Sequence, residues 1–249
     1  MRPFSPTVAK IREFAQRAVG HQLNHVLIQL YRDGTDHISE HSDKTLDIVR
    51  DSKIVNVSFG AQRTMTLRAK KSSAEWEAQH LPNNDTASSS SISAPSVDDK
   101  TTSPSPNPPS PAETASTNTV AALPARAAQK IHLPHNSMFV LGQRTNAAWL
   151  HAIRPDKRPS NIKSSAEVAF EGQRISFTFR HIGTYLVPSD GSHVIYGQGA
   201  TSKVRETAKP VIRGASEECE KMIYAFGTEN HLSDFDWDKY YGDGFDVFQ

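Results

Sequence analysis

The stretch NHVLIQLYRDGTDHISEHSD, residues 24–43, combines a strand pattern with two residue types that bind metals. HVLIQLY at 25–31 is a short apolar run of strand length, and the RDG that follows it is typical of a turn. His41 and Asp43 close the stretch with one residue between them. On a strand, residues two apart point to the same face. The stretch therefore predicts a short element that presents an imidazole and a carboxylate together.

His41 and Asp43 form a partial metal site, which a second histidine from elsewhere in the chain would complete. Two histidines and one carboxylate occupy one face of an octahedron and leave positions open for a chelating ligand and dioxygen, the pattern of non-haem Fe(II) oxygenases. The residues alone do not choose the second histidine. The candidates are His80, His132, His135, His151, His181, His193 and His231.

The clearest alternation in the chain is RISFTFR, residues 174–180. One face is apolar and consists of Ile175, Phe177 and Phe179. The other face is polar and consists of Arg174, Ser176, Thr178 and Arg180. If the apolar face packs against a second layer, the polar face either meets water or lines a cavity. Because arginine pairs with carboxylates through two parallel hydrogen bonds, a cavity with these side chains would suit a dicarboxylate.

The remaining patterns predict a mainly β chain with flanking helices. Strands are expected at 53–60, 62–70 and 137–142. A helix is expected over 5–18, with Ser5 as its N-cap and Pro6 at its first position. A second helix is expected over 216–226, with Ser216 as its cap and Gly227 as its end. Many short strands and few helices favour one β-rich domain.

Residues 82–130 differ in composition from the rest of the chain, with SSSSIS, PSPNPPSP and no aromatic residue. Such a segment buries too little apolar surface to offset its ordering entropy, so we expect a disordered insert. Residues 1–81 would then be the N-terminal part of the domain, 131–186 its C-terminal part, and 187–249 an extension of unassigned role. The insert could also be a linker between two domains.

Composition limits the class of protein. The 28 Lys and Arg residues nearly balance 27 Asp and Glu, which argues against nucleic-acid binding by bulk positive charge but leaves room for a local basic patch. A single cysteine, Cys219, excludes an intrachain disulfide and a Cys-rich zinc site. No apolar run approaches the roughly 20 residues of a membrane helix, and the N-terminus lacks a signal-peptide core. We therefore expect an intracellular protein, nuclear or cytoplasmic, monomeric and without a membrane partner.

Three other motifs have less support. HISEH at 37–41 matches the H-x-x-E-H zinc-peptidase signature, but that chemistry requires a helix, and a turn is expected just before it. His37 and Glu40 are better explained as residues around the metal site. The proline between His132 and His135 favours a loop, and GQGATSK at 197–203 lacks the spacing of a phosphate-binding loop, so it too is expected to be a flexible loop.

Three of these segments together resemble the AlkB-family dioxygenases. Residues 24–43 are similar to the family's strand and turn that lead to the first iron ligands. TNAAWLHAI at 145–153 resembles its distal-histidine segment, and RISFTFR resembles its Arg-x-Asn-x-Thr-Phe-Arg strand. Because all three occur in the family's order, the chain is identified as a member. The resemblance implies a double-stranded β-helix, or jelly roll.

The resemblance also implies the cofactors and their residues. Fe(II) would be bound by His41, Asp43 and His151. The co-substrate 2-oxoglutarate would be bound by Gln29, Tyr31, Arg174, Ser176, Thr178 and Arg180. Dioxygen would be consumed, and 2-oxoglutarate would be converted to succinate and carbon dioxide while a C–H bond is hydroxylated. If the hydroxylated carbon is an N-methyl group, the product would release formaldehyde. The substrate that the resemblance implies is an alkylated nucleobase in DNA or RNA.

Several positions depart from the family pattern. Gln29 and Ser176 both stand where asparagine is usual, although each keeps a hydrogen-bonding group. Lys44 and Thr45 stand where repair members carry acidic residues that help to read the damaged base. The family's N-terminal nucleotide-recognition lid is not evident, which suggests a truncated gene model or another substrate. The alternatives are therefore a dioxygenase for a protein or small molecule, and a catalytically inactive binding module.

Overall fold

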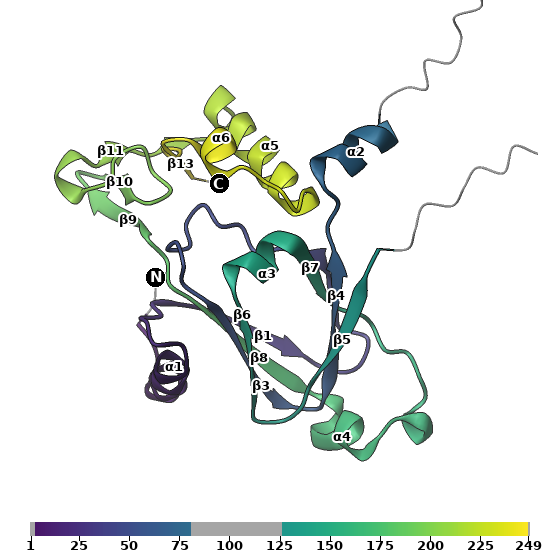
Figure 1. The fold of residues 1–249 in the computed structure, drawn as a ribbon. Coiled ribbons are helices and arrows are strands. Elements are labelled where there is room, and N and C mark those ends of the chain that lie inside the picture. The colour runs from purple at the N-terminus through teal and green to yellow at the C-terminus, as the bar shows by residue number, and fades with distance from the viewer. Residues whose placement is uncertain (1–2, 81–125, 249) are drawn as a thin grey trace, which may run out of the picture. The chain divides into compact units, whose positions relative to one another are not determined.

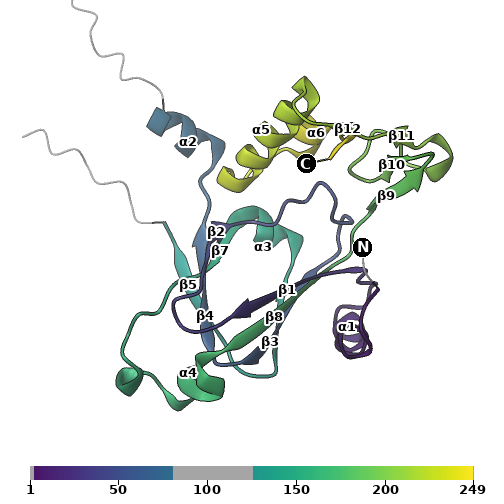
Figure 2. The ribbon, with the colours of Figure 1, turned by 180° about the vertical axis from the view of Figure 1, so that it is seen from behind.

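Two antiparallel four-stranded sheets form the centre of the computed structural model, which describes residues 3–80 and 126–248. The first sheet has the order β1 (His25–Tyr31), β8 (Arg174–Arg180), β3 (Ile54–Gly60) and β6 (Ser137–Leu141). The second has the order β2 (Ile38–His41), β7 (Trp149–Ile153), β4 (Arg63–Ala69) and β5 (Ala128–Leu133). Figures 1 and 2 show the two sheets as facing layers. This arrangement confirms the predicted mainly β jelly roll with flanking helices.

The inner faces of the two sheets share one apolar cluster. Its buried members are Tyr31, Met65, Leu67, Leu133 and Ile153, which come from both sheets. Burial of such side chains contributes roughly 1.5–3 kcal/mol each relative to exposure. The cluster therefore fixes the spacing between the layers.

Helix α1 (Pro6–Val19) covers part of the outer face of the first sheet. As predicted, the Ser5 side chain caps it by accepting a hydrogen bond from the backbone N–H of Val8, and proline begins the helix. Phe177 and Phe179 of β8 pack in the same cluster as Ala15 and Val19 of the helix. Phe177 and Phe179 of RISFTFR thus pack against α1, whereas Ile175 on the same face is exposed, and the polar face turns inward to the pocket described below.

Most strand predictions agree with the observed strands, whereas α3 (Gln143–Ala148) is a helix that was not predicted, and two local predictions are wrong. Asp43 lies beyond β2, which ends at His41, so the expected strand does not carry both residues. Helix α5 (Glu217–His231) passes through Gly227. A glycine inside a helix costs only about 1 kcal/mol, and buried Glu229 continues the packed face beyond it.

The boundaries expected around the insert and the extension also shift. Residues 82–125, most of the expected insert, lie outside the described residues. Residues 128–130, assigned to the insert, belong to β5, and β9 (Thr184–Ser189) crosses the expected boundary at 186. The described parts on both sides of the insert belong to one unit.

The region from residue 187 onward has its own apolar cluster. Its elements after β9 are β10 (Ser192–Gly197), β11 (Lys209–Pro210), β12 (Ile212–Arg213), α5, α6 (Trp237–Tyr241) and β13 (Val247–Phe248). Cys219, Met222 and Ala225 of α5 pack against Tyr241 and Phe245, with Leu46 of the jelly roll in the same cluster. The acidic, aromatic C-terminal stretch therefore packs its aromatic rings against α5 and the jelly roll.

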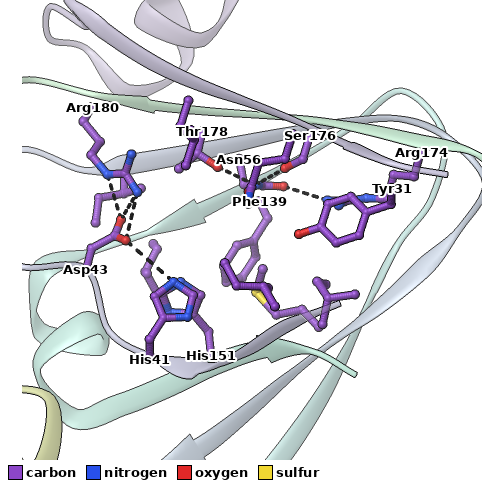
Figure 3. Close-up of a pocket in the computed structure, with 17 residues that line it drawn as sticks. Tyr31, His41, Asp43, Asn56, Phe139, His151, Arg174, Ser176, Thr178 and Arg180 are labelled. Carbon is purple, nitrogen blue, oxygen red and sulfur yellow. Dashed lines mark hydrogen bonds and ion pairs between the residues drawn. The ribbon is translucent and has the colours of Figure 1, made fainter. Parts of the chain in front are cut away.

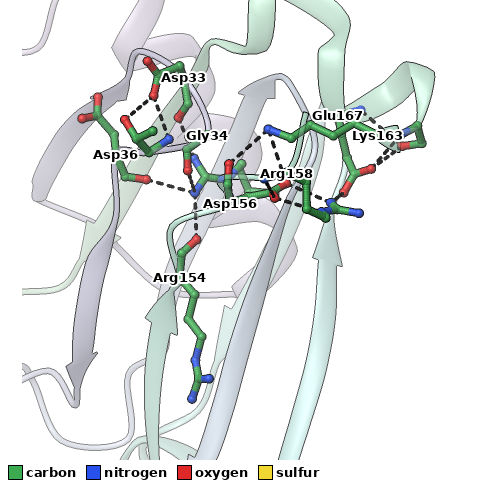
Figure 4. A network of polar contacts seen from close by, with 11 residues as sticks. Asp33, Gly34, Asp36, Arg154, Asp156, Arg158, Lys163 and Glu167 are labelled. Atoms are coloured by element: carbon green, nitrogen blue, oxygen red, sulfur yellow. Dashed lines mark hydrogen bonds and ion pairs between the residues drawn. The ribbon is translucent and has the colours of Figure 1, made fainter. Parts of the chain in front are cut away.

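One buried arginine, Arg63, stabilises the turn between β1 and β2 through hydrogen bonds to its backbone. The Arg63 guanidinium donates to the backbone carbonyls of Asp33, Gly34, Asp36 and Arg154 at 2.9–3.2 Å. Figure 4 shows this network beside α4 (Ser165–Val168), together with the ion pairs of Arg158. Because these carbonyls belong to loops, the arginine fixes the turn that leads into β2 and to His41.

Helix α2 (Ser73–His80) follows β4 at the edge of the described residues. Within the part of the chain that the structure describes, no helix is long and apolar enough to cross a membrane.

Candidate metal centre and dicarboxylate pocket

A pocket lies between the two sheets and is lined by residues of both. From the first sheet come Leu27, Gln29, Tyr31, Ile54, Asn56, Phe139, Leu141, Arg174, Ser176, Thr178 and Arg180. From the second sheet and the segment after β2 come Ile38, His41, Asp43, Met65, His151 and Ile153. The charged groups lie at two ends of the pocket, and Thr178, Asn56 and Ser176 lie between them (Figure 3). We call the end with His41, Asp43 and His151 the metal end, and the end with Arg174 and Tyr31 the dicarboxylate end.

Three donor side chains meet at the metal end. One ligand atom from each of His41, Asp43 and His151 lies within 4.8 Å of the others. His41 and His151 are directly paired in the β2–β7 ladder, and their ring centroids are 4.2 Å apart. Nδ1 of His41 bonds to the carbonyl of Ser39, which leaves Nε2 toward Asp43 at 4.0 Å. The donor atoms therefore converge as a metal ion requires, with the orientation of His41 set by a backbone partner.

Asp43 is held by two other side chains. Nε and Nη2 of Arg180 donate to its two carboxylate oxygens, each at 2.9 Å. Asn146 of α3 bonds its backbone twice, accepting from the N–H at 3.0 Å and donating to the carbonyl at 2.8 Å. Burial alone would raise the pKa of the Asp43 carboxyl, but the guanidinium of Arg180 outweighs burial and leaves the pKa lowered. The carboxylate is therefore ionised at neutral pH.

His151 is neutral at physiological pH. Burial, and then the nearby ring of His41, lower its pKa from 6.5 to about 4. A neutral imidazole is the form that binds a metal. His151 and Asp43 are thus in the protonation states that metal binding requires.

Arg174 defines the dicarboxylate end. It is 1% exposed, and its Nη2 donates to Oδ1 of Asn56 at 3.1 Å and to Oγ of Ser58 at 2.8 Å. Its Nε and Nη1 are buried with no hydrogen-bond partner. Burial lowers the pKa of the guanidinium to about 10, so it remains charged at neutral pH. A buried cation with two unpartnered nitrogens is costly unless an anion completes it, so this end of the pocket is suited to a carboxylate.

Tyr31 and Asn56 surround the arginine. The β1–β8 register places Tyr31 opposite Arg174, and the guanidinium carbon lies 5.1 Å from the centre of its ring. Nδ2 of Asn56 donates to the hydroxyls of Ser176 at 2.7 Å and Thr178 at 2.9 Å. Asn56 thus connects three of the pocket's polar residues. It was missed by the sequence reasoning, although a lone amide between the apolar residues of a strand was a signal.

The six residues expected to bind the co-substrate all line this pocket: Gln29, Tyr31, Arg174, Ser176, Thr178 and Arg180. Arg180 differs from the others, since its guanidinium is engaged by Asp43. Neither arginine faces bulk solvent, because Arg174 is 1% exposed and the side chain of Arg180 is 14% exposed.

The competing motifs lead elsewhere. Ile38–His41 of HISEH forms strand β2 and not a helix, so the zinc-peptidase alternative is wrong. Glu40 of this motif forms ion pairs with Arg68 and Arg154. Nδ1 of His135 accepts from the backbone N–H of Gly60. Lys203 donates to three backbone carbonyls, so GQGATSK is a fixed loop and not a flexible one. Of the other distal-histidine candidates, the side chain of His80 lies outside those described.

A jelly roll with two histidines and one carboxylate converging in its centre defines the class of non-haem Fe(II) oxygenases. The family model of the 2OG-Fe(II) oxygenase superfamily matches residues 1–88 and 112–180. The chain belongs to this superfamily.

Curated relatives support the AlkB-like assignment within the superfamily. The human DNA oxidative demethylase ALKBH2 is 41% identical over 71 residues, which are 28% of this chain and 27% of the relative. ALKBH2 of Bos taurus is 36% identical over 80 residues, 32% of this chain and 29% of the relative. An uncharacterized mimivirus protein, R406, is 32% identical over 83 residues, 33% of this chain and 42% of the relative. The matches therefore span less than half the length of each of these relatives.

Proposed function

We propose that this protein is an Fe(II)- and 2-oxoglutarate-dependent dioxygenase that hydroxylates or oxidatively demethylates an alkylated nucleobase. One observation carries the proposal. The same pocket holds three convergent metal donors and, at its other end, a buried arginine with two unpartnered nitrogens. A cation site and a carboxylate site in one cavity fit a co-substrate with an oxo-acid group at one end and a carboxylate at the other.

His41, Asp43 and His151 are the proposed metal ligands. When bound there, Fe(II) would supply open coordination positions for the 2-oxo acid and for dioxygen, and with them the oxidising chemistry of the family. The protein contributes a carboxylate already ionised beside Arg180 and an imidazole kept neutral by burial. The geometry needs little rearrangement, since the donor atoms lie within 4.8 Å of one another.

Arg174 is the proposed partner of the distal carboxylate of 2-oxoglutarate. Its unpartnered Nη1 would donate to the carboxylate, while Asn56 and Ser58 hold Nη2. Ser176, Thr178 and Gln29 line the wall between the two ends. The apolar side chains of Phe139, Leu141 and Ile54 would limit the access of water to the bound co-substrate.

The nucleobase substrate is proposed from the relatives and not from the pocket. The two ALKBH2 relatives are named DNA oxidative demethylases, and their matched segments share 36–41% identity with this chain. The substrate would be an N-alkylated base in DNA or RNA.

The test is a turnover assay on the full chain with Fe(II), ascorbate and 2-oxoglutarate. We expect succinate formation that is stimulated by an N-methylated oligonucleotide and not by its unmethylated counterpart, together with release of formaldehyde. Asp43→Ala should abolish turnover because it removes both a donor atom and the partner of Arg180. Succinate formation that survives in Asp43→Ala would refute the metal site, and turnover indifferent to methylated oligonucleotides would refute the nucleobase substrate.

A further inference from the structure

The proposed metal ligand Asp43 stands in a segment, Ser42–Thr45, that belongs to no strand or helix. Its backbone N–H groups are bonded by side chains from distant parts of the chain. The N–H of Ser42 donates to Oδ1 of Asn230 at 2.9 Å, and the N–H of Asp43 donates to Asn146 at 3.0 Å. The N–H of Thr45 donates to the carboxylate of Glu229 at 3.1 Å. Side-chain contacts therefore replace the sheet ladder that fixes other pocket residues.

Two of these partners, Glu229 and Asn230, lie on α5, far beyond residue 180 where the family model stops matching. Oδ1 of Asn230 also accepts from Nζ of Lys44 at 3.2 Å. The carboxylate of Glu229 also accepts from the hydroxyl of Thr45 at 2.5 Å. Both residues that depart from the family pattern after Asp43 are thus engaged by the C-terminal helix.

The end of α5 is itself firmly held. Glu229 is 4% exposed, and the Tyr241 hydroxyl donates to its carboxylate at 2.5 Å. Nζ of Lys70, at the end of β4, donates to the backbone carbonyl of Glu229 at 2.7 Å. Backbone bonds between Lys71 and both His231 and Ser233 join the same two elements. These bonds hold the end of α5 in place beside the segment.

We propose that the C-terminal region is a structural part of the metal centre, with Asn230 and Glu229 as positioning residues for Asp43. The inference rests on the proposed function for the identity of the metal. A ligand on an irregular segment keeps its place only if the backbone on both sides of it is fixed. The bonds to Ser42 and Thr45 fix the two sides, while Asn146 fixes the residue between them.

The first measurement is the metal affinity of the full chain. It is obtained by titrating the protein with Co(II) and recording the visible absorption of the bound ion. We expect Asn230→Ala to weaken Co(II) binding by about 10- to 100-fold, the usual effect of losing a group that orients a ligand. Asn230→Asp keeps an acceptor oxygen for Ser42 and Lys44 and should restore affinity to within a few-fold. Thr228→Ala, on the same helix, is the matched control, because its hydroxyl bonds within α5 to the carbonyl of Tyr224.

The second measurement is amide hydrogen exchange of the metal-free protein, which does not depend on the identity of the metal. Asn230→Ala should speed exchange of the Ser42 amide, and Glu229→Ala should speed exchange of the Thr45 amide. Thr228→Ala should exchange at the wild-type rate at both amides. Unchanged exchange at both amides, or faster exchange with unchanged Co(II) affinity, would overturn the inference. If the wild-type protein binds no Co(II) while amide exchange at Ser42 and Thr45 is still faster in the variants, the proposed metal site is refuted. The positioning of the segment by Asn230 and Glu229 is then still supported.

Discussion

The two ends of the pocket are built in different ways. At the dicarboxylate end, the side chains stand on three neighbouring strands, where Tyr31 is paired with Arg174 and Asn56 with Thr178. At the metal end, Asp43 stands outside any strand and is held by side chains from α3 and β8. A ladder positions its side chains through backbone hydrogen bonds alone, whereas an irregular segment requires dedicated partners. The two ends should therefore respond differently to substitution.

The largest effect is expected at the dicarboxylate end, from Arg174→Met. This variant keeps a side chain of similar length but removes the buried charge. The carboxylate of the co-substrate then loses its charged partner, at a cost in binding free energy of roughly 2–5 kcal/mol. We expect the KM for 2-oxoglutarate to rise about 100-fold or more, measured by succinate formation, with a folded protein. Arg158→Gln removes the same charge from a residue outside this pocket and serves as the control. A KM within twofold of wild type would remove Arg174 from the proposed site.

Asn146→Ala tests the metal end in the same way. It removes both bonds to the backbone of Asp43 without touching a donor atom. Metal affinity should fall by about 10- to 100-fold, while the KM for 2-oxoglutarate at saturating metal changes little. Gln143→Ala, on the same helix, is the control because its side chain bonds to the carbonyl of Val49. If Asn146→Ala instead raised the KM and spared metal affinity, the two ends would not be independent.

Asn56→Ala should have a smaller effect at the dicarboxylate end. The asparagine bonds to Arg174, Ser176 and Thr178 but leaves the free N–H groups of Arg174 in place. We expect the KM for 2-oxoglutarate to rise by about 10-fold, equivalent to one or two hydrogen bonds of roughly 1 kcal/mol. Val57→Ala, on the same strand but in the cluster with α1, should lower stability without changing the KM. Equal changes in KM for the two variants would indicate a general loosening of β3.

The smallest effect concerns pH and the metal end. Because burial lowers the pKa of His151 from 6.5 to about 4, the unfolded chain binds a proton in this range that the folded chain does not. Acid therefore favours unfolding, and the metal-free protein should lose stability as pH falls from 6.5 toward 4. The lowering of the pKa from 6.5 to about 4 corresponds to roughly 3 kcal/mol, so the Tm should drop by about 5–10 °C more in wild type than in His151→Gln. Parallel pH profiles of the two proteins would contradict the burial of a neutral imidazole.

The same contrast explains how far the sequence could predict the molecule. RISFTFR sits in a ladder, so alternation alone separated its pocket face from the face that packs on α1. His41 and Asp43 were found from their spacing, yet the reason given was incomplete, since β2 ends before Asp43. Their convergence comes instead from Arg180 and Asn146, which are separated from Asp43 by 137 and 103 residues. Contacts at such separations leave no periodic signal in the sequence.

The C-terminal region shows the limit more clearly. Its helix was predicted from a cap and an apolar pattern, and the cap is present. Its end was placed at Gly227, which would have excluded Glu229 and Asn230 from the helix. The helix continues because Glu229 is held there by two hydrogen bonds. The Tyr241 hydroxyl donates to its carboxylate, and Nζ of Lys70, 159 residues away in the sequence, donates to its backbone carbonyl.

Strand β8 lies between β1 and β3, paired residue by residue with both. Side chains alternate between the faces of a sheet, so a single inserted or deleted residue inside 174–180 would exchange the two faces of part of this strand. Phenylalanine rings would then fill the cavity, and guanidinium groups would be forced under α1. A point substitution changes one side chain, but a change of length moves side chains on both faces at once, so natural variants of this chain should keep the spacing between Arg174 and Arg180 fixed.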